Sequence, residues 1–248
     1  MYAAVIIPAR YASTRFPGKP LVTLKGKPLL EHVYEKARGA RLANEVIIAT
    51  DSQDILDAAK AFGAKAVMTS RSHASGTDRV AEAARKFVPQ AGIIVNLQGD
   101  EPLIRPEMID DVIMLMADGQ ADMGTLAKKI ENPEEFEDPN VVKVVCDLKG
   151  YALYFSRAPI PFPRDGRPVS GEKTFGYKHI GIYAYKKESL IRLAGLAPVS
   201  LEQAEKLEQL RALSNGMRIK VKETSFDTIG VDTPDDIAKV EKWLNTYS

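Results

Sequence analysis

Short apolar runs alternate with amphipathic segments through the first half of the chain, and this alternation is what most limits its fold. Three apolar runs have the length of buried strands, at 3–8, 45–50 and 93–97. The segments near them carry apolar residues on one face at helical spacing, at about 28–38, 52–62 and 77–88, and Pro106 opens a further helix. Strands alternating with helices predict the α/β class, with a mostly parallel sheet covered by helices.

The second half has a different pattern, with more strands and fewer helices. Strand-like runs fall at 122–130, 141–147, 151–156, 177–185 and 217–222, and helices are expected at about 201–214 and 234–246. The stretch 157–175 is rich in proline, glycine and charge, which predicts a loop or arm. Because no linker or repeat interrupts the chain, we expect one domain over 1–248 with a β-rich insertion at about 122–185.

Composition excludes several classes of function. The net charge is +1, so a broad basic field for nucleic acid or a membrane surface is not expected. A single cysteine, Cys146, rules out an internal disulfide and fits a reducing compartment; on its predicted strand we expect it to pack in the core. No apolar run is long enough for a signal peptide or a membrane span. We therefore expect a cytoplasmic protein.

The first thirty residues carry five cationic side chains and no carboxylate. Three of them, Arg10, Arg15 and Lys19, follow the first predicted strand, at the sheet edge where α/β proteins bind ligands. Cations this close repel one another unless an anion joins them, which favours a polyphosphate ligand over a solvated surface loop. No Gly-x-Gly occurs, and Gly18-Lys19-Pro20 lacks the pattern of a P-loop. The sequence therefore predicts phosphate binding by side-chain cations, helped by backbone N–H groups of the 10–19 loop.

Two aspartates are candidate metal ligands. Asp100 directly follows the buried run at 93–97, and Mg²⁺ prefers one or two carboxylates together with phosphates and water. The alternative is that Asp100 caps the next turn. Asp232 is the candidate second ligand, although Asp232-Thr233-Pro234 also has the pattern of a helix N-terminus.

Further segments carry polar residues whose role the pattern leaves open. The turn at 72–79 offers hydroxyls and N–H groups to a base or ribose; otherwise Thr77 is an N-cap and Arg79 is solvated. His179 alternates with apolar residues on a strand, where a structural role is commoner than catalysis. Glutamates recur every three residues at 202, 205 and 208, the pattern of a solvated helix face.

Seven segments together carry a resemblance to one family, and they occur in that family's order: 9–20, 75–79, 97–102, 155–161, 179–183, 207–211 and 230–234. The chain resembles the 3-deoxy-D-manno-octulosonate cytidylyltransferase family, also called CMP-Kdo synthetase. The similarity runs from Val5 to about Val240 and so covers nearly the whole chain. It implies the fold of the nucleotide-diphospho-sugar transferases.

The resemblance also implies an activity and its partners. The reaction is CTP + 3-deoxy-D-manno-octulosonate (Kdo) → CMP-Kdo + pyrophosphate, which supplies sugar for lipopolysaccharide, in a Mg²⁺-dependent homodimer. The acceptor hydroxyl attacks the α-phosphate in line with the leaving pyrophosphate, with no side-chain nucleophile and no covalent intermediate.

Site residues follow from the matching positions. The resemblance implies triphosphate binding by Arg10, Ser13, Arg15 and Lys19, and cytidine binding by Ser75, Gly76 and Arg79. It implies Mg²⁺ binding by Asp100 and Asp232, and it implies Kdo binding by Gln98, Arg157, His179, Tyr183, Glu208 and Gln209. Arg15, Lys19, Asp100 and Asp232 are the catalytic set, and Arg157 is expected to pair with the Kdo carboxylate.

The sequence leaves three other hypotheses open. In the first, the acceptor is another ulosonic acid, such as 8-amino-Kdo or a sialic acid. In the second the chain is a metal-dependent glycosyltransferase, and in the third it is a nucleotide-sensing module. The cationic loop disfavours a glycosyltransferase, because a triphosphate carries more negative charge than a diphospho-sugar.

Overall fold

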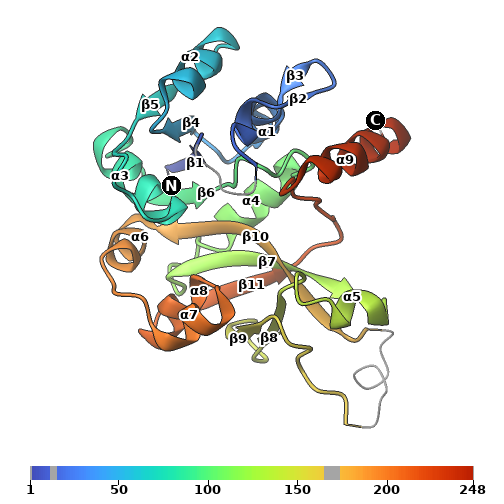
Figure 1. Ribbon diagram of the computed structural model, residues 1–248. Helices are drawn as coiled ribbons and strands as arrows, with labels where there is room; N and C mark the ends of the chain where they lie inside the picture. Colours follow the sequence, from blue (N-terminus) through green and yellow to red (C-terminus); the bar gives the residue numbers. More distant parts are fainter. Residues whose placement is uncertain (1, 12–15, 165–173, 248) are drawn as a thin grey trace.

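The computed structural model describes residues 2–11, 16–164 and 174–247, and it has a mixed sheet with helices on both faces (Figure 1). The main path of the sheet runs in the order β11-β7-β10-β6-β1-β4-β5. These strands are β11 (Ile219–Glu223), β7 (Met123–Ile130), β10 (Gly176–Lys186), β6 (Ile93–Asn96), β1 (Ala3–Ala9), β4 (Glu45–Thr50) and β5 (Ala66–Met68). Among these described strands β10 alone runs opposite to the others. The predicted α/β class with a mostly parallel sheet is confirmed.

Helices cover the sheet in two groups because strand residues alternate between its faces. In β1, Val5 and Ile7 point to one core cluster, and Ala4 and Ile6 to the other. The first face is covered by α1 (Leu29–Arg38), α2 (Gln53–Ala61) and α4 (Pro106–Met114). The second is covered by α3 (Gly76–Lys86), α6 (Lys187–Ala194) and α8 (Gln209–Ser214).

Smaller elements attach to this frame. The strands β8 (Lys143–Cys146) and β9 (Ala152–Ser156) form a hairpin whose β8 also pairs with β10. A short hairpin of β2 (Thr23–Leu24) and β3 (Lys27–Pro28) follows the 3-10 helix η1 (Lys19–Leu21). The C-terminal helix α9 (Pro234–Tyr247) packs against this end through Val240, beside Leu24, Leu29 and Leu103. The remaining helices are α5 (Pro133–Glu137) and α7 (Ser200–Glu205).

Several expectations about elements need correction. The helix expected at 201–214 is two helices, because Lys206 adopts a left-handed conformation with φ of 55° and ends α7. The helix expected at 77–88 begins at Gly76, and its N-cap is Ser75 rather than Thr77. Cys146 is exposed on the β8–β9 hairpin, so the expected core packing is wrong.

The sheet topology collects the candidate segments at one edge. Ala9 pairs with Thr50, and Ile6 pairs with Asn96, so β1, β4 and β6 end on the same side. The loops that follow these strands carry residues 10–11 and 16–19, Asp51 and Asp100. Since β10 runs the other way, its first residues extend past that edge. Among the described helices, none combines the length and the apolar character needed to cross a membrane.

Candidate active site

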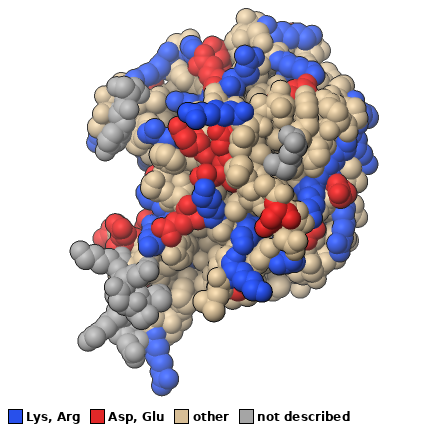
Figure 2. All heavy atoms as spheres, turned by 180° about the vertical axis from the view of Figure 1, so that it is seen from behind, with Lys and Arg blue, Asp and Glu red and all other residues tan. Residues whose placement is uncertain are grey.

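Lys19 lies between the two candidate metal ligands. Its Nζ is 2.5 Å from Asp100 Oδ2 and 3.3 Å from Asp232 Oδ1. The Lys19 side chain is only 14% exposed, whereas Asp232 is 52% exposed. On the face shown in Figure 2, acidic side chains gather beside a hollow with lysines and arginines around them. One ammonium group therefore bridges two carboxylates at the carboxyl edge of the sheet.

The loop before Lys19 closes on itself at Gly18. The Gly18 N–H donates to the Tyr11 carbonyl at 3.0 Å, and Gly18 has a φ of 71°, a left-handed conformation that favours glycine. Gly18 is also the N-cap of η1, so Lys19 is the first residue of that helical turn. Two predicted triphosphate residues, Ser13 and Arg15, lie outside the described residues.

The loop that carries Asp232 is fixed to the loop that carries Asp100. The Val231 N–H donates to the Asp100 carbonyl at 2.9 Å. Asp236 receives the backbone N–H groups of Asp232 and Thr233, which orders the start of α9. Glu101 follows Asp100 and lies against Gly230, and its pKa is raised to about 8 by burial and by the nearby charges of Asp100 and Asp232. The two carboxylates are thus brought together by backbone contacts as well as by Lys19.

The predicted nucleotide residues lie at the start of α3 and beside it. Ser75 caps α3 in a reciprocal pair with Asp78, and Gly76 packs near Pro8 of β1. Arg10 Nη1 donates to the Ala74 carbonyl at 3.2 Å, which ties the first loop to the α3 turn. The N–H groups at the start of this helix provide a favourable environment for an anion.

Arg79 differs from the other predicted nucleotide residues because its side chain is fully buried. Its Nη2 is 2.7 Å from Asp51 Oδ2, and its Nη1 donates to Thr69 Oγ1. The expectation of a solvated Arg79 is therefore wrong. In this conformation the guanidinium joins α3 to the loops after β4 and β5.

Gln98, His179 and Tyr183 lie where β10 passes the end of β6. Tyr183 pairs with Asn96, and the ring centroids of His179 and Tyr183 are 5.2 Å apart. His179 Nε2 is 3.0 Å from Thr125 Oγ1, and burial lowers the pKa of His179 to about 3. His179 is therefore neutral at physiological pH and offers hydrogen bonds rather than charge.

Arg157 is held by backbone carbonyls. Its Nε donates to the Glu205 carbonyl at 2.8 Å, and its Nη1 donates to the Pro139 carbonyl at 2.9 Å. The buried Lys143 in turn donates to the Arg157 carbonyl at 2.7 Å. The two guanidinium bonds use two of the five N–H groups, so a forked contact between a carboxylate and the two Nη groups does not require either carbonyl to be displaced.

The glutamates at 202, 205 and 208 are all engaged, which corrects the expectation of an ordinary solvated face. Glu205 accepts the Ser156 hydroxyl at 2.6 Å, and Arg211 is bound by both oxygens of Glu202. Glu208 accepts the Thr77 hydroxyl and lies 3.4 Å from Arg211 Nη2. Burial raises the pKa of Glu208, and these partners oppose that change. Gln209, its neighbour, is buried at the start of α8.

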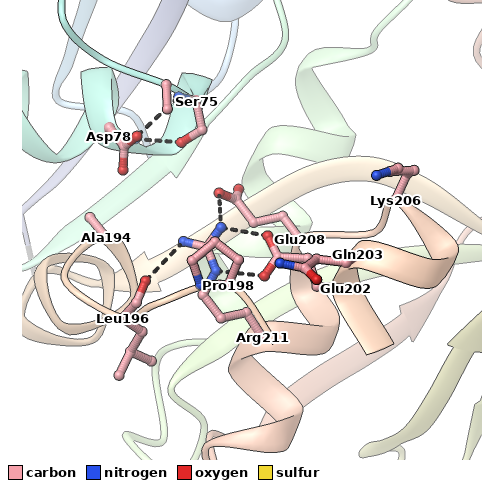
Figure 3. A pocket seen from close by; sticks show the side chains of 11 residues that line it. Ser75, Asp78, Ala194, Leu196, Pro198, Glu202, Gln203, Lys206, Glu208 and Arg211 are labelled. Atoms are coloured by element: carbon pink, nitrogen blue, oxygen red, sulfur yellow. Dashed lines mark hydrogen bonds and ion pairs between the residues drawn. The ribbon is translucent and has the colours of Figure 1, made fainter. Parts of the chain in front are cut away.

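A pocket of about 550 Å³ separates α3 from α7 and α8 (Figure 3). Figure 3 shows Arg211 between Glu202 and Glu208, with Ser75 and Asp78 across the opening. The pocket therefore joins a residue predicted for the nucleotide, Ser75, to one predicted for the sugar, Glu208.

A second pocket, of about 460 Å³, lies beside the first loop. It is lined by Tyr11, Arg71 and residues 51–54 at the end of β4. Sequence reasoning missed Arg71 because β5, the strand before it, has three residues and no long apolar run. Arg71 Nε donates to the Asp51 carbonyl at 3.3 Å, so this cation is held at the same edge.

The residues present fit a divalent cation of the Mg²⁺ type. Mg²⁺ uses one or two carboxylates and takes its other ligands from phosphates and water. Asp100 and Asp232 already share one cationic group, Lys19 Nζ. Within the described part of the chain, no group of three or more histidine, cysteine or carboxylate side chains is placed to hold a metal. The donor set therefore suits an ion that arrives with a phosphate ligand.

Comparison with known proteins identifies the family. The family model described as Cytidylyltransferase matches residues 4–219. A 3-deoxy-manno-octulosonate cytidylyltransferase of Thermodesulfovibrio yellowstonii is 53% identical, with both chains covered completely. One of Geobacter sulfurreducens is also 53% identical, covering 97% of this chain and 98% of that protein. The chain belongs to the 3-deoxy-manno-octulosonate cytidylyltransferase family.

Solved structures agree with this family. A CMP:2-keto-3-deoxy-manno-octonic acid synthetase complexed with CTP is 43% identical and superimposes with a TM-score of 0.92, each chain being fully covered. A 4-diphosphocytidyl-2C-methyl-D-erythritol synthase from Anaerococcus prevotii is 15% identical with a TM-score of 0.65, and it covers 98% of this chain and 96% of its own. The second likeness concerns the fold alone. The family resemblance predicted from the sequence is confirmed.

Proposed function

We propose that this protein transfers the cytidylyl group of CTP to Kdo, forming CMP-Kdo and pyrophosphate for lipopolysaccharide synthesis. The observation that carries the proposal is 53% identity, over the full length of both chains, to a protein named for this activity. The ion pairs of Lys19 with Asp100 and Asp232 support the proposal, because they lie at the edge of the sheet where α/β proteins bind ligands.

The chemistry is a single displacement at phosphorus. The anomeric hydroxyl oxygen of Kdo forms a bond to the α-phosphorus, and the bond from that phosphorus to the bridging oxygen breaks. The electron pair leaves with pyrophosphate, and the hydroxyl proton passes to solvent or a nearby base. Catalysis of this kind depends on positioning and on neutralising charge.

Lys19 and Arg10 supply the charge that neutralises the leaving pyrophosphate in this proposal, together with Arg15. Asp100 and Asp232 hold Mg²⁺, which when bound polarises the α-phosphate and lowers the pKa of the attacking hydroxyl. Because Lys19 lies within 3.3 Å of both carboxylates, it must exchange these partners for phosphate oxygens when the nucleotide binds.

The acceptor side is formed by polar side chains at the start of α8 and where β10 passes the end of β6. We assign Kdo binding to Gln98, His179, Tyr183, Glu208 and Gln209, with Arg157 at its margin. A neutral His179 donates or accepts hydrogen bonds at sugar hydroxyls. The nucleotide contacts its half of the site through Ser75 and Gly76 at the start of α3.

The test is pyrophosphate release from CTP and Mg²⁺ with the sugar acid varied. Kdo-dependent release supports the proposal, and release with 8-amino-Kdo or a sialic acid but not Kdo moves the assignment to that acid. Nucleotide binding without release in the presence of any acid contradicts an enzymatic role. Omission of Mg²⁺ with a chelator present should abolish release.

We also propose that the protein is a cytoplasmic homodimer, as the family resemblance implies. Light scattering during gel filtration should give twice the 27.3 kDa chain mass. A monomer mass at micromolar concentration would contradict the dimer.

A further inference from the structure

Arg157 follows β9 and lies between the end of α7 and the loop after α5 (Figure 1). Its Nε donates to the Glu205 carbonyl, and its Nη1 donates to the Pro139 carbonyl. Carbonyl oxygens orient the guanidinium without neutralising its charge. Two of the five N–H groups are used in this way, so three remain on Nη1 and Nη2. The side chain is therefore fixed in direction and keeps a forked end for an anion.

Lys143 holds the backbone on which these contacts depend. Its side chain is fully buried, and its ammonium donates to the carbonyls of Asp138 at 2.9 Å, Val141 at 2.6 Å and Arg157 at 2.7 Å. An ammonium group has three N–H donors, so these carbonyls use all of them. Lys143 thereby fixes the backbone of Arg157. It also fixes both ends of the loop in which Pro139 supplies a carbonyl to the guanidinium.

Glu205 holds Arg157 from the other side, with its side chain as well as its backbone. Its Oε2 accepts the Arg157 backbone N–H at 2.9 Å, and its Oε1 accepts the Ser156 hydroxyl at 2.6 Å. Because Glu205 is the last residue of α7, these bonds join that helix to the end of β9. The contacts that orient Arg157 therefore come from Glu205 or from groups that Lys143 holds.

The end of β9 also lies beside the acceptor side of the candidate site. The ring of Phe155, two residues before Arg157, meets the ring of His179 edge-on, with centroids 5.2 Å apart. The His179 N–H donates to the carbonyl of Val142, the residue before Lys143, at 2.8 Å. Since His179 is assigned to Kdo, the segments that carry Lys143 and Arg157 are packed against the acceptor strand β10.

We propose that Lys143 and Glu205 are positioning residues that hold Arg157 for the carboxylate of the sugar acid. This inference rests on the proposed function, in which Arg157 lies at the margin of the acceptor site. A guanidinium that is already fixed loses less side-chain freedom when it forms two parallel N–H···O bonds with a carboxylate. Lys143 has no exposed surface, so it acts on the substrate only through Arg157.

Three variants and one control test the proposal. Lys143→Met keeps an unbranched side chain and removes the ammonium, and Glu205→Gln replaces one accepting oxygen by an amide that donates. Arg157→Met removes the guanidinium itself. Lys186→Met is the matched control, because the Lys186 ammonium also donates to a backbone carbonyl but lies at the other end of β10. The assay is pyrophosphate release, with KM measured separately for Kdo and for CTP.

We expect KM for Kdo to rise about tenfold in Lys143→Met and in Glu205→Gln, as when one charge-assisted hydrogen bond is lost. KM for CTP should change less than about twofold, and Lys186→Met should resemble the unaltered protein. Arg157→Met should raise KM for Kdo at least as much. Adding either positioning variant to Arg157→Met should raise it by less than about a further twofold, because both act on the same contact.

Three results would overturn the proposal: an unchanged KM for Kdo, a parallel rise of KM for both substrates, or independent effects in the double variants. Circular dichroism checks the fold of each variant. If Lys143→Met does not fold, Glu205→Gln alone and combined with Arg157→Met decides the outcome by the same criteria.

The unaltered protein separates this failure from failure of the proposed function. If it releases no pyrophosphate with Kdo, the proposed function has failed, and the positioning of Arg157 is judged by NMR instead. Lys143→Met and Glu205→Gln should then shift the Nε–H signal of Arg157, whereas Lys186→Met should not. An unmoved Nε–H signal would overturn the positioning role on its own.

Discussion

Replacing Arg79 with methionine separates a structural role from direct nucleotide binding. The guanidinium is fully buried, with Asp51 at 2.7 Å and Thr69 as its second partner. Removing one partner of a buried ion pair costs about 3–5 kcal/mol of unfolding free energy. Asp51 keeps 21% exposure and can be partly hydrated, and Arg79 Nε has no hydrogen-bond partner among the described residues. Both facts place the expected cost at the lower end, about 3 kcal/mol.

A loss of about 3 kcal/mol lowers the melting temperature of a chain this size by roughly 6–12 °C. Thermal unfolding followed by circular dichroism measures it, and KM for CTP is measured well below the transition. We expect KM for CTP to change less than about threefold, since the side chain does not reach the surface. Arg85→Met is the control, because Arg85 is exposed on the same helix and should shift stability by no more than about 0.5 kcal/mol.

Two results would refute this reasoning. A melting temperature equal to that of Arg85→Met would mean that the Asp51 pair contributes nothing. An unchanged melting temperature with KM for CTP raised about tenfold would instead support the sequence-based prediction that Arg79 contacts the nucleotide.

Four further predictions concern the site. Asp100→Asn should reduce turnover by about a hundredfold or more, equivalent to ~2.7 kcal/mol, with an unchanged circular dichroism spectrum; near-normal turnover would contradict the proposal that Asp100 is a metal ligand. Lys19→Met should bind Mn²⁺ more tightly without nucleotide, by paramagnetic resonance titration, because the carboxylates lose their ammonium partner; equal affinity would contradict that competition. In the unfolded chain His179 takes up a proton below its ordinary pKa of 6.5, whereas in the folded chain it does so only near pH 3. The free energy of unfolding should therefore decrease as the pH is lowered from about 6.5 to about 3, by up to about 1.4 kcal/mol per pH unit; urea unfolding should show that His179→Gln loses this slope. Labelled CTP alone should leave no label on the protein; a nucleotidylated enzyme would indicate a covalent intermediate.

The strands were predictable from sequence because burial on both faces requires continuous apolar runs. The run at 45–50 matches β4 residue for residue, and the run at 93–97 differs from β6 by one. β5 was missed because it has three residues, of which Met68 is exposed, so it carries no such signal. The helical spacing of residues also predicted one helix where the structure has α7 and α8, because this spacing carries no sign of the left-handed backbone at Lys206 between them.

The position of a candidate residue was predictable where the strand before it was predictable. Asp100 follows the buried strand β6 and therefore lies at the carboxyl edge of the sheet, as the sequence indicates. Lys19 pairs with Asp100, which is 81 positions away in the sequence, and with Asp232, which is 213 positions away; sequence spacing alone does not reveal either pair. The alternative of a solvated Arg79 was wrong for the same reason. Its partner Asp51 is 28 residues earlier, and only packing of α3 against the end of β4 buries the charge.

The acid-free opening segment acquires its counter-charges from the rest of the fold. Lys19 is 14% exposed, and a cation so placed is stable only with a partner, which Asp100 supplies at 2.5 Å. The two carboxylates likewise lie close together because Lys19 offsets their repulsion. A triphosphate that draws Lys19 away leaves the two carboxylates without a counter-charge, and a divalent cation supplies it. A divalent cation that takes the carboxylates leaves Lys19 without a partner, and the triphosphate oxygens supply one. Neither exchange is favourable alone, because it strands the remaining partner in a partly buried site. The geometry therefore favours joint binding of nucleotide and cation over binding of either one separately.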